Sequence, residues 1–156
     1  VNGGCTGCTL SFVARNISQS NLLIGDIVQA AGIDTSSVSE EQTPVIQVMP
    51  ATSGDAALGV VLGRTEKTFA KPDIDDTRTG AHYGPVDGSV GPGDYLIIVV
   101  QGMAQIRLDP AVQVQPGDFV QAGADGAIQA IDTAPFGTVL EQAQENGLAW
   151  VLVGLN

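Results

Sequence analysis

A short motif occurs twice in the chain, as Gly25-Asp26-Ile27-Val28-Gln29-Ala30 and as Gly117-Asp118-Phe119-Val120-Gln121-Ala122, and it decides the fold. Each copy is followed, after a variable insert, by a second matching piece: Ala57–Leu62 in the first copy and Pro135–Leu140 in the second. A glycine at positive φ followed by aspartate is typical of a turn that reverses the chain into a strand. The sequence therefore predicts two weakly similar β units, over residues 21–66 and 114–156.

A third copy of the turn occurs at Gly93-Asp94-Tyr95, and proline precedes two of the three copies, at Pro92 and Pro116. The aspartate can accept hydrogen bonds from nearby turn amides. Six residues are therefore predicted to have a structural role in turns: Gly25, Asp26, Gly93, Asp94, Gly117 and Asp118. A carboxylate site repeated two or three times is the functional alternative, but the flanking proline and glycine already account for the pattern.

Strand patterns recur along the chain, whereas no window of twelve residues has apolar positions at helical spacing behind a cap. The clearest strands are Val45–Val48, Leu96–Val100, Ala104–Leu108 and Trp150–Val153. Asp125-Gly126 and Asn146-Gly147 are typical of tight hairpin turns. We predict an all-β fold of about ten to twelve strands: a compact β-barrel or β-clip-like sandwich with little or no helix. Residues 1–20 are expected to form an N-terminal cysteine-containing strand segment, residues 21–156 the β domain, and residues 68–89 an inserted loop.

The charge balance excludes several classes of partner. Six basic residues stand against seventeen acidic ones, which gives a formal net charge of −11. Such a chain repels phosphate backbones and anionic headgroups, so binding to nucleic acid or to a membrane surface is not expected. The longest apolar stretches, Tyr95–Val100 among them, are far shorter than the ~20 residues of a membrane helix, so no membrane insertion is expected.

Both cysteines lie in one Cys-x-x-Cys pattern, Cys5 and Cys8. Haem attachment needs a histidine directly after the second cysteine, where this chain has Thr9. A closed zinc site needs four ligands, but the two cysteines and the single histidine, His82, supply only three. A redox-active cysteine pair would lie at the N-terminus of a helix, but apolar and polar residues alternate in Thr9–Ala14 as in a strand. We predict a structural disulfide, within or between chains, which would place the protein outside a reducing cytosol. Metal binding and redox chemistry are the alternatives.

Three carboxylates, Asp73, Asp75 and Asp76, lie close together and could bind calcium. The segment does not fit an EF-hand loop because Arg78 stands where that loop needs glycine. A solvated acidic loop is the simpler interpretation. Calcium is thus the one cofactor considered, and otherwise none is expected.

No catalytic residue is assigned. His82 has no nucleophile among its sequence neighbours, and the chain has no Gly-x-Ser-x-Gly elbow, His-Glu-x-x-His or phosphate-binding loop. Glu40-Glu41 and the pair Glu141 and Glu145 could form acid–base carboxylates, but nothing in the sequence ties them together. The sequence therefore predicts a protein that is not an enzyme. Asn16-Ile17-Ser18 matches the glycosylation acceptor pattern.

Most of the chain resembles a β-rich C-terminal module of repetitive bacterial surface and fibre-like proteins, and also the β-clip-like head decoration proteins of tailed phages. The resemblance is carried by Gly4–Asn16, Val100–Leu108, Val114–Val120, Gly126–Ala130, Phe136–Glu141 and Trp150–Val153. It implies an accessory or assembling β module in an extracellular or virion structure, with no known catalysis. The two-cysteine start departs from typical decoration proteins and favours the surface-fibre group.

The leading prediction is a non-enzymatic structural protein, extracellular or at the cell surface, that assembles with other copies of itself into a filament, fibre or lattice. Exposed strand edges make strand addition an accessible route to a homopolymer or homotrimer. The predicted assembly strand comprises Thr9, Leu10, Phe12 and Val13. One alternative is a phage or virus capsid decoration or tail-fibre domain, located in the virion. A second is a small metal-binding or redox protein that uses Cys5 and Cys8.

Overall fold

The computed structural model describes residues 9–38, 44–52, 56–69, 81–130 and 135–154. These residues are almost entirely strands and turns, so the predicted all-β class is confirmed. The ten strands are β1 (Leu10–Asn16), β2 (Ile27–Val38), β3 (Pro44–Pro50), β4 (Ala57–Phe69), β5 (Ala81–Val86), β6 (Tyr95–Arg107), β7 (Phe119–Gln121), β8 (Ile128–Gln129), β9 (Gly137–Val139) and β10 (Leu148–Val153).

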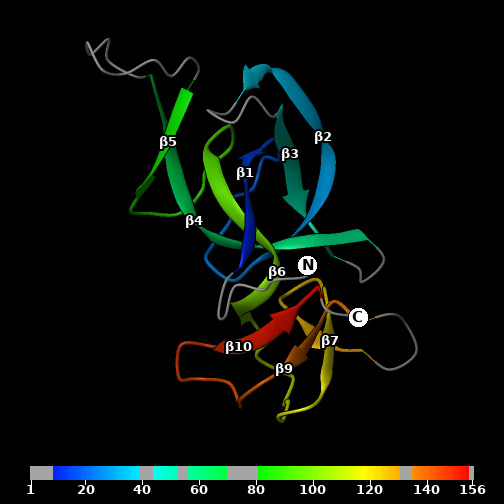
Figure 1. The fold of residues 1–156 in the computed structure, drawn as a ribbon. Helices are drawn as coiled ribbons and strands as arrows, with labels where there is room; N and C mark the ends of the chain where they lie inside the picture. The colour runs from blue at the N-terminus through cyan, green and yellow to red at the C-terminus, as the bar shows by residue number, and fades with distance from the viewer. Residues whose placement is uncertain (1–8, 39–43, 53–55, 70–80, 131–134, 155–156) are drawn as a thin grey trace, which may run out of the picture.

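The first lobe is a closed barrel of five strands. Pairing runs in the order β4, β2, β3, β1 and β6, and β6 pairs back to β4, which closes the ring. All of these pairs are antiparallel except β1 with β3. Strand β5 extends this lobe through the far half of β4, as the upper part of Figure 1 shows. A closed ring leaves no free edge on these five strands over their paired length.

The second lobe is built on the other half of the same long strand. Beyond the first barrel, β6 pairs with β10, and the order continues through β9 and β7 to β8. A parallel bridge between Leu108 and Ala127 brings the chain before β8 back beside the end of β6. Strands β7, β9 and β10 lie side by side in the lower part of Figure 1. The two lobes are therefore fused through β6.

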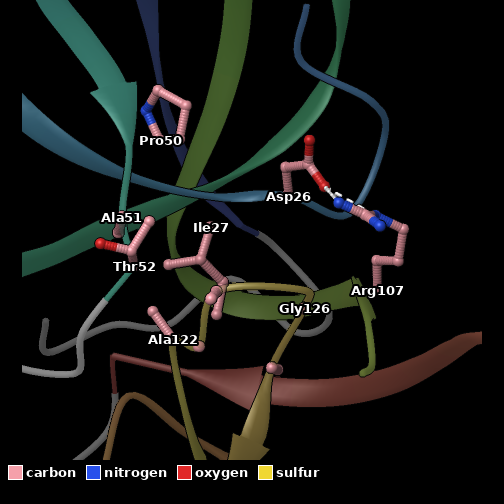
Figure 2. Close-up of a pocket in the computed structure, with 11 residues that line it drawn as sticks. Asp26, Ile27, Pro50, Ala51, Thr52, Arg107, Ala122 and Gly126 are labelled. Carbon is pink, nitrogen blue, oxygen red and sulfur yellow. Dashed lines mark hydrogen bonds and ion pairs between the residues drawn. The ribbon is translucent and has the colours of Figure 1, made fainter. Parts of the chain in front are cut away.

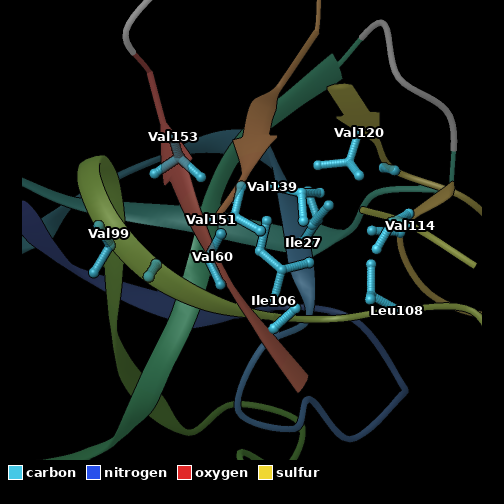
Figure 3. Close-up of a cluster of buried hydrophobic side chains, with 14 of the residues drawn as sticks. Ile27, Val60, Val99, Ile106, Leu108, Val114, Val120, Val139, Val151 and Val153 are labelled. Atoms are coloured by element: carbon cyan, nitrogen blue, oxygen red, sulfur yellow. The ribbon is translucent and has the colours of Figure 1, made fainter. Parts of the chain in front are cut away.

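Two hydrophobic cores lie on opposite faces of the strands at this junction. Ile27, Val60 and Val99 are aligned across β2, β4 and β6, and they pack with the second lobe (Figure 3). We call that cluster the lower core; it also contains Ile106, Leu108, Val114, Val120, Val139, Val151 and Val153. The residue adjacent to each of these on its strand, Val28, Val61 or Ile98, packs in the first barrel, in a cluster that we call the upper core. Successive strand residues point to opposite faces, so these strands must be apolar on both faces.

The two motif copies occupy equivalent places in the two lobes. Each opens a strand, β2 or β7, and its second piece lies in the antiparallel neighbour, β4 or β9. The register is the same in both: Ile27↔Val60 matches Phe119↔Thr138, and Val28↔Gly59 matches Val120↔Gly137. The sequence repeat is thus a repeat of one turn and one strand pair.

The structure differs from the sequence interpretation in two segments. The segment 68–89, interpreted as an inserted loop, contains β5, which pairs with β4 from Arg64↔Val86 to Phe69↔Ala81. Pro85 disfavours a strand in the sequence, but it is tolerated here because β5 is an edge strand. The described part of the N-terminal segment 1–20 is not separate either, because β1 is one of the five strands of the first barrel.

Candidate functional site

The three Gly-Asp turns have the same geometry. In each, the aspartate Oδ2 accepts a 2.9 Å hydrogen bond from the backbone N–H three residues earlier: Leu23 to Asp26, Gly91 to Asp94, and Gln115 to Asp118. Their glycines have φ angles of +93°, +82° and +95°. These three carboxylates are therefore held within their own turns.

Asp26 has a second partner that connects the two lobes. Its Oδ1 accepts hydrogen bonds from Nε and a terminal nitrogen of Arg107, the first at 2.7 Å (Figure 2). The backbone N–H of Arg107 also donates to the carbonyl oxygen of Gly25 at 2.9 Å. The Asp26 side chain is only 13% exposed, so this charged pair is partly shielded from solvent. The turn before β2 is thereby fixed to the end of β6.

A small cavity lies beside this ion pair. Its volume is about 60 Å³, and its lining includes Asp26, Ala51, Thr52, Arg107 and Gly126 (Figure 2). Ligand pockets usually have volumes of about 300–1,000 Å³, so a cavity of this size suits ordered water and not an organic substrate. We interpret this junction as structural.

Asn16 is a buried polar residue whose role the sequence did not indicate. Its side-chain Nδ2 donates to the carbonyl oxygens of Ser20, Val90 and Gly91 at 2.8, 3.2 and 3.2 Å. Its Oδ1 accepts from the backbone N–H and the hydroxyl of Ser18 at 3.0 and 2.6 Å. With 0% exposure, the amide nitrogen that a glycan would need is inaccessible in the folded chain. The match of Asn16-Ile17-Ser18 to the glycosylation pattern is therefore a structural coincidence.

Large apolar side chains cover the outer face of the second lobe, on the side of the sheet opposite the lower core. We call them the outer apolar face: Met103 on β6, Trp150 and Leu152 on β10, Leu140 after β9, and Phe119 on β7. Met103 lies opposite Leu152, and the N–H of Leu140 donates to the carbonyl of Trp150 at 2.9 Å. Four of the five side chains are between 39% and 51% exposed.

A groove continues this face toward the first lobe. It has a volume of about 250 Å³ and joins Met103 and Trp150 to Ile24 and Leu62, which are 51% and 54% exposed. Its other lining residues are Thr9, Val60, Val61, Val99, Ala104 and Gln105. None of the ten lining residues carries a charge. The groove therefore suits an apolar surface better than a charged ligand.

The predicted assembly strand lies within the chain's own barrel. Leu10 pairs with Gln101 and Phe12 with Ile98 on β6, and β1 pairs with β3 only from Ala14 onward. Leu10 and Phe12 are 49% and 41% exposed, and Thr9 lines the groove. The role of these residues in joining copies stays a prediction.

Several other predicted residues lie outside the described ranges: Cys5, Cys8, Asp73, Asp75, Asp76 and the pair Glu40-Glu41. His82 lies in β5. Glu141 accepts hydrogen bonds from Gln144 Nε2 at 2.7 Å and from the Trp150 N–H at 3.1 Å, which ties it to the hairpin before β10. Within the ranges that the structure covers, no three acidic, histidine or cysteine side chains gather as a metal site would require, and no helix is long and apolar enough to span a membrane.

The sequence does contain one sign of the outer apolar face. In Leu148–Val153 the residues on the buried face, Ala149, Val151 and Val153, alternate with Leu148, Trp150 and Leu152. A strand with one solvated face normally alternates apolar with polar residues. A short strand that is apolar on both faces, with only one of them packed in the lower core, therefore presents an apolar face to solvent.

Comparison with known proteins places the fold but not a family. No protein-family model and no curated protein sequence matches the chain. The head fiber gp8.5 N base of bacteriophage phi29 is similar in structure, with a TM-score of 0.53 and 20% identity over 94% of this chain and 95% of that one. The C-terminal fragment of phi29 gene product 12 matches with a TM-score of 0.48 and 12% identity, over 94% and 99% of the two chains. The fold shared with the head fiber base agrees with the phage side of the resemblance drawn from the sequence and gives no support to the bacterial surface proteins.

Proposed function

We propose that this chain is a non-enzymatic structural component of a phage virion, of the head-decoration or fibre type. The observation that carries the proposal is the fold shared with a phage head fiber base over almost the whole of both chains. A fold shared at 20% identity can serve several functions, so the proposal also needs support from the surface and the sites of this chain.

The polar groups of the described residues favour a structural role. Asp94 and Asp118 are held in turns, and Asp26 is held in a turn and by Arg107. Asn16 uses its amide on backbone carbonyls. The extended apolar face with its uncharged groove suits contact with another protein.

The fold similarity favours the virion interpretation over the extracellular filament that the sequence first suggested. Both are structural roles, and both would use exposed surfaces in place of reactive side chains. They differ in what surrounds the chain: a capsid or tail in one case, and only further copies in the other.

Immunogold electron microscopy tests the proposal. Antibodies raised against the purified chain are applied to purified particles of the virus whose genome encodes it. We expect gold at a defined place on the head or tail, and none on particles from a mutant with a stop codon early in the gene. Unlabelled wild-type particles, with a strong signal from infected-cell extract by the same antibody, would refute a virion role.

A further inference from the structure

We propose that the outer apolar face and its groove form the surface onto which a second copy of this chain docks. The inference rests on the proposed structural role and deepens it by naming the partner and the contact surface. Three features of the described residues support it: the size of the apolar surface, the uncharged lining of the groove, and the place of the surface in the internal repeat.

The exposed area is what a specific interface needs. Ile24, Leu62, Met103, Phe119, Leu140 and Trp150 are each 39–54% exposed. Together they present roughly 600 Å² of apolar surface, which is at the top of the range for the largest patch on a monomer. A standard interface takes about 800 Å² from each partner, of which somewhat more than half is apolar. One copy of this patch therefore supplies the apolar part of one side of such an interface.

The charge distribution allows a copy of the same chain to dock at this surface. The chain carries a formal charge of −11, so most approaches of two copies bring acidic surfaces together. The ten residues that line the groove and the five of the outer apolar face are all uncharged. Glu141 stands at the rim, and its Oε1 already accepts two hydrogen bonds. Two copies that meet through this surface have no like charges at the centre of their interface, where charge repulsion would weaken association most.

The internal repeat shows the same kind of surface in a covered state. In the first lobe, Ile27 and Val60 pair across β2 and β4 and are only 7% and 1% exposed, because the lower core of the same chain packs on them. Their equivalents in the second lobe are Phe119 and Thr138. Phe119 is 51% exposed. The strand pair that is covered within the chain in one lobe is thus open in the other, and a second copy would cover it.

The unmodified chain offers a direct test because Trp150 is its single tryptophan and lies in this surface. The experiment records the tryptophan emission spectrum and the sedimentation coefficient of the same samples. Their concentrations span about three decades around the dissociation constant of self-association. Docking buries an indole that is 39% exposed in the free chain. The emission maximum should therefore move to the red as dilution lowers the sedimentation coefficient. An oligomer that dissociates with no change in emission would overturn the proposed surface.

Two charge substitutions and one matched control locate the contact. Leu140→Glu and Met103→Glu each place a carboxylate within the surface, and Ile33→Glu adds the same charge at a residue that is 61% exposed on β2 of the first lobe. The first two should weaken self-association at least about 30-fold, as expected for an unpaired charge in a hot spot. Ile33→Glu should leave it within about 3-fold, as a peripheral charge does. Circular dichroism checks that the variants fold, and because these positions are exposed they should tolerate the substitutions. If both variants unfold, the emission measurement on the unmodified chain tests the proposed surface instead.

Three results would overturn the inference. The wild-type chain could stay monomeric at the highest concentration reached. The three variants could weaken association equally. The free chain could stay monomeric while Leu140→Glu abolishes its binding to virus particles, which would assign the surface to a capsid protein. Self-association is measured on the free chain, so its failure is distinct from failure of the virion role, which the particles test.

Discussion

Replacing Asn16 with alanine should destabilise the fold more than any other single change to a polar side chain in the first lobe. Asn16 is fully buried, and it joins the end of β1 to the segments around Ser20 and Val90. Its amide supplies donors to three carbonyl oxygens, and its Oδ1 receives the backbone N–H of Ser18. Alanine removes all of these contacts and leaves a small cavity.

The expected cost follows from which partners are left without a bond. The carbonyl of Val90 still accepts from the Leu22 N–H at 2.8 Å, and the carbonyl of Gly91 from the Asp94 N–H at 3.0 Å. These acceptors are therefore not orphaned, and the loss is that of the two N–H donors of the amide and of the bond accepted from the Ser18 backbone N–H. At about 1 kcal/mol net for each, with a small cavity term, the free energy of unfolding should fall by about 2–4 kcal/mol. The melting temperature should fall by about 5–15 °C.

Urea unfolding followed by circular dichroism measures this change. Gln19→Ala is the matched control, because Gln19 is exposed in the same turn and should change stability by less than about 0.5 kcal/mol. Asn16→Asp should be at least as damaging as Asn16→Ala, since it puts a carboxylate among the carbonyl oxygens. If Asn16→Ala were as stable as Gln19→Ala, the hydrogen bonds assigned to Asn16 would not hold the first lobe together.

Three further changes test the junction of the lobes. Gly25→Ala should lower the free energy of unfolding by about 3 kcal/mol, because a Cβ there would lie 2.8 Å from the backbone N of Arg107. Gly117→Ala is the control: the glycine has a similar φ but open space around it, so the loss should be about 1 kcal/mol. If urea unfolding gave the two variants equal losses of stability, the close contact between Gly25 and Arg107 would be contradicted. A double-mutant cycle of Asp26→Asn with Arg107→Met should give a coupling of about 1–2 kcal/mol that shrinks in high salt; additive effects would mean that the ion pair does not join the lobes. Ile106→Ala should cost about 2–5 kcal/mol and keep a single calorimetric transition, because both lobes share β6; two separate transitions would show that the lobes unfold independently.

Local chemistry made the turns and the strand content predictable from the sequence. A glycine at positive φ and an aspartate that accepts a nearby N–H need only residues within one turn, so the three Gly-Asp turns could be placed without a structure. The repeat followed from the same motif.

The long strand β6 was not predictable as one element. Its two halves, Leu96–Val100 and Ala104–Leu108, are separate strand patterns in the sequence, but the structure joins them through Gly102, which has a φ of +114°. The adjacent residues Ile98 and Val99 serve two different cores. A strand that changes barrels along its length therefore lacks the single alternation that marks one buried face.

Long-range contacts were beyond the sequence for a different reason. Asp26 and Arg107 are 81 positions apart, and nothing local in either segment indicates the other. The outer apolar face likewise gathers residues from four separate stretches, Met103, Phe119, Leu140 and Trp150, and only strand pairing brings them together. The sequence does show that β10 is apolar on both faces. This pattern indicates an exposed apolar surface only after the structure has shown that one face of β10 packs in the lower core.

A structural component of a virus particle must be present in every particle at a fixed copy number. Quantitative mass spectrometry across a density gradient of purified particles measures this for the proposed virion role. We expect the chain to follow the major capsid protein through the particle peak at a constant molar ratio. A chain found only among the soluble proteins at the top of the gradient, with none in the particle peak, would contradict it.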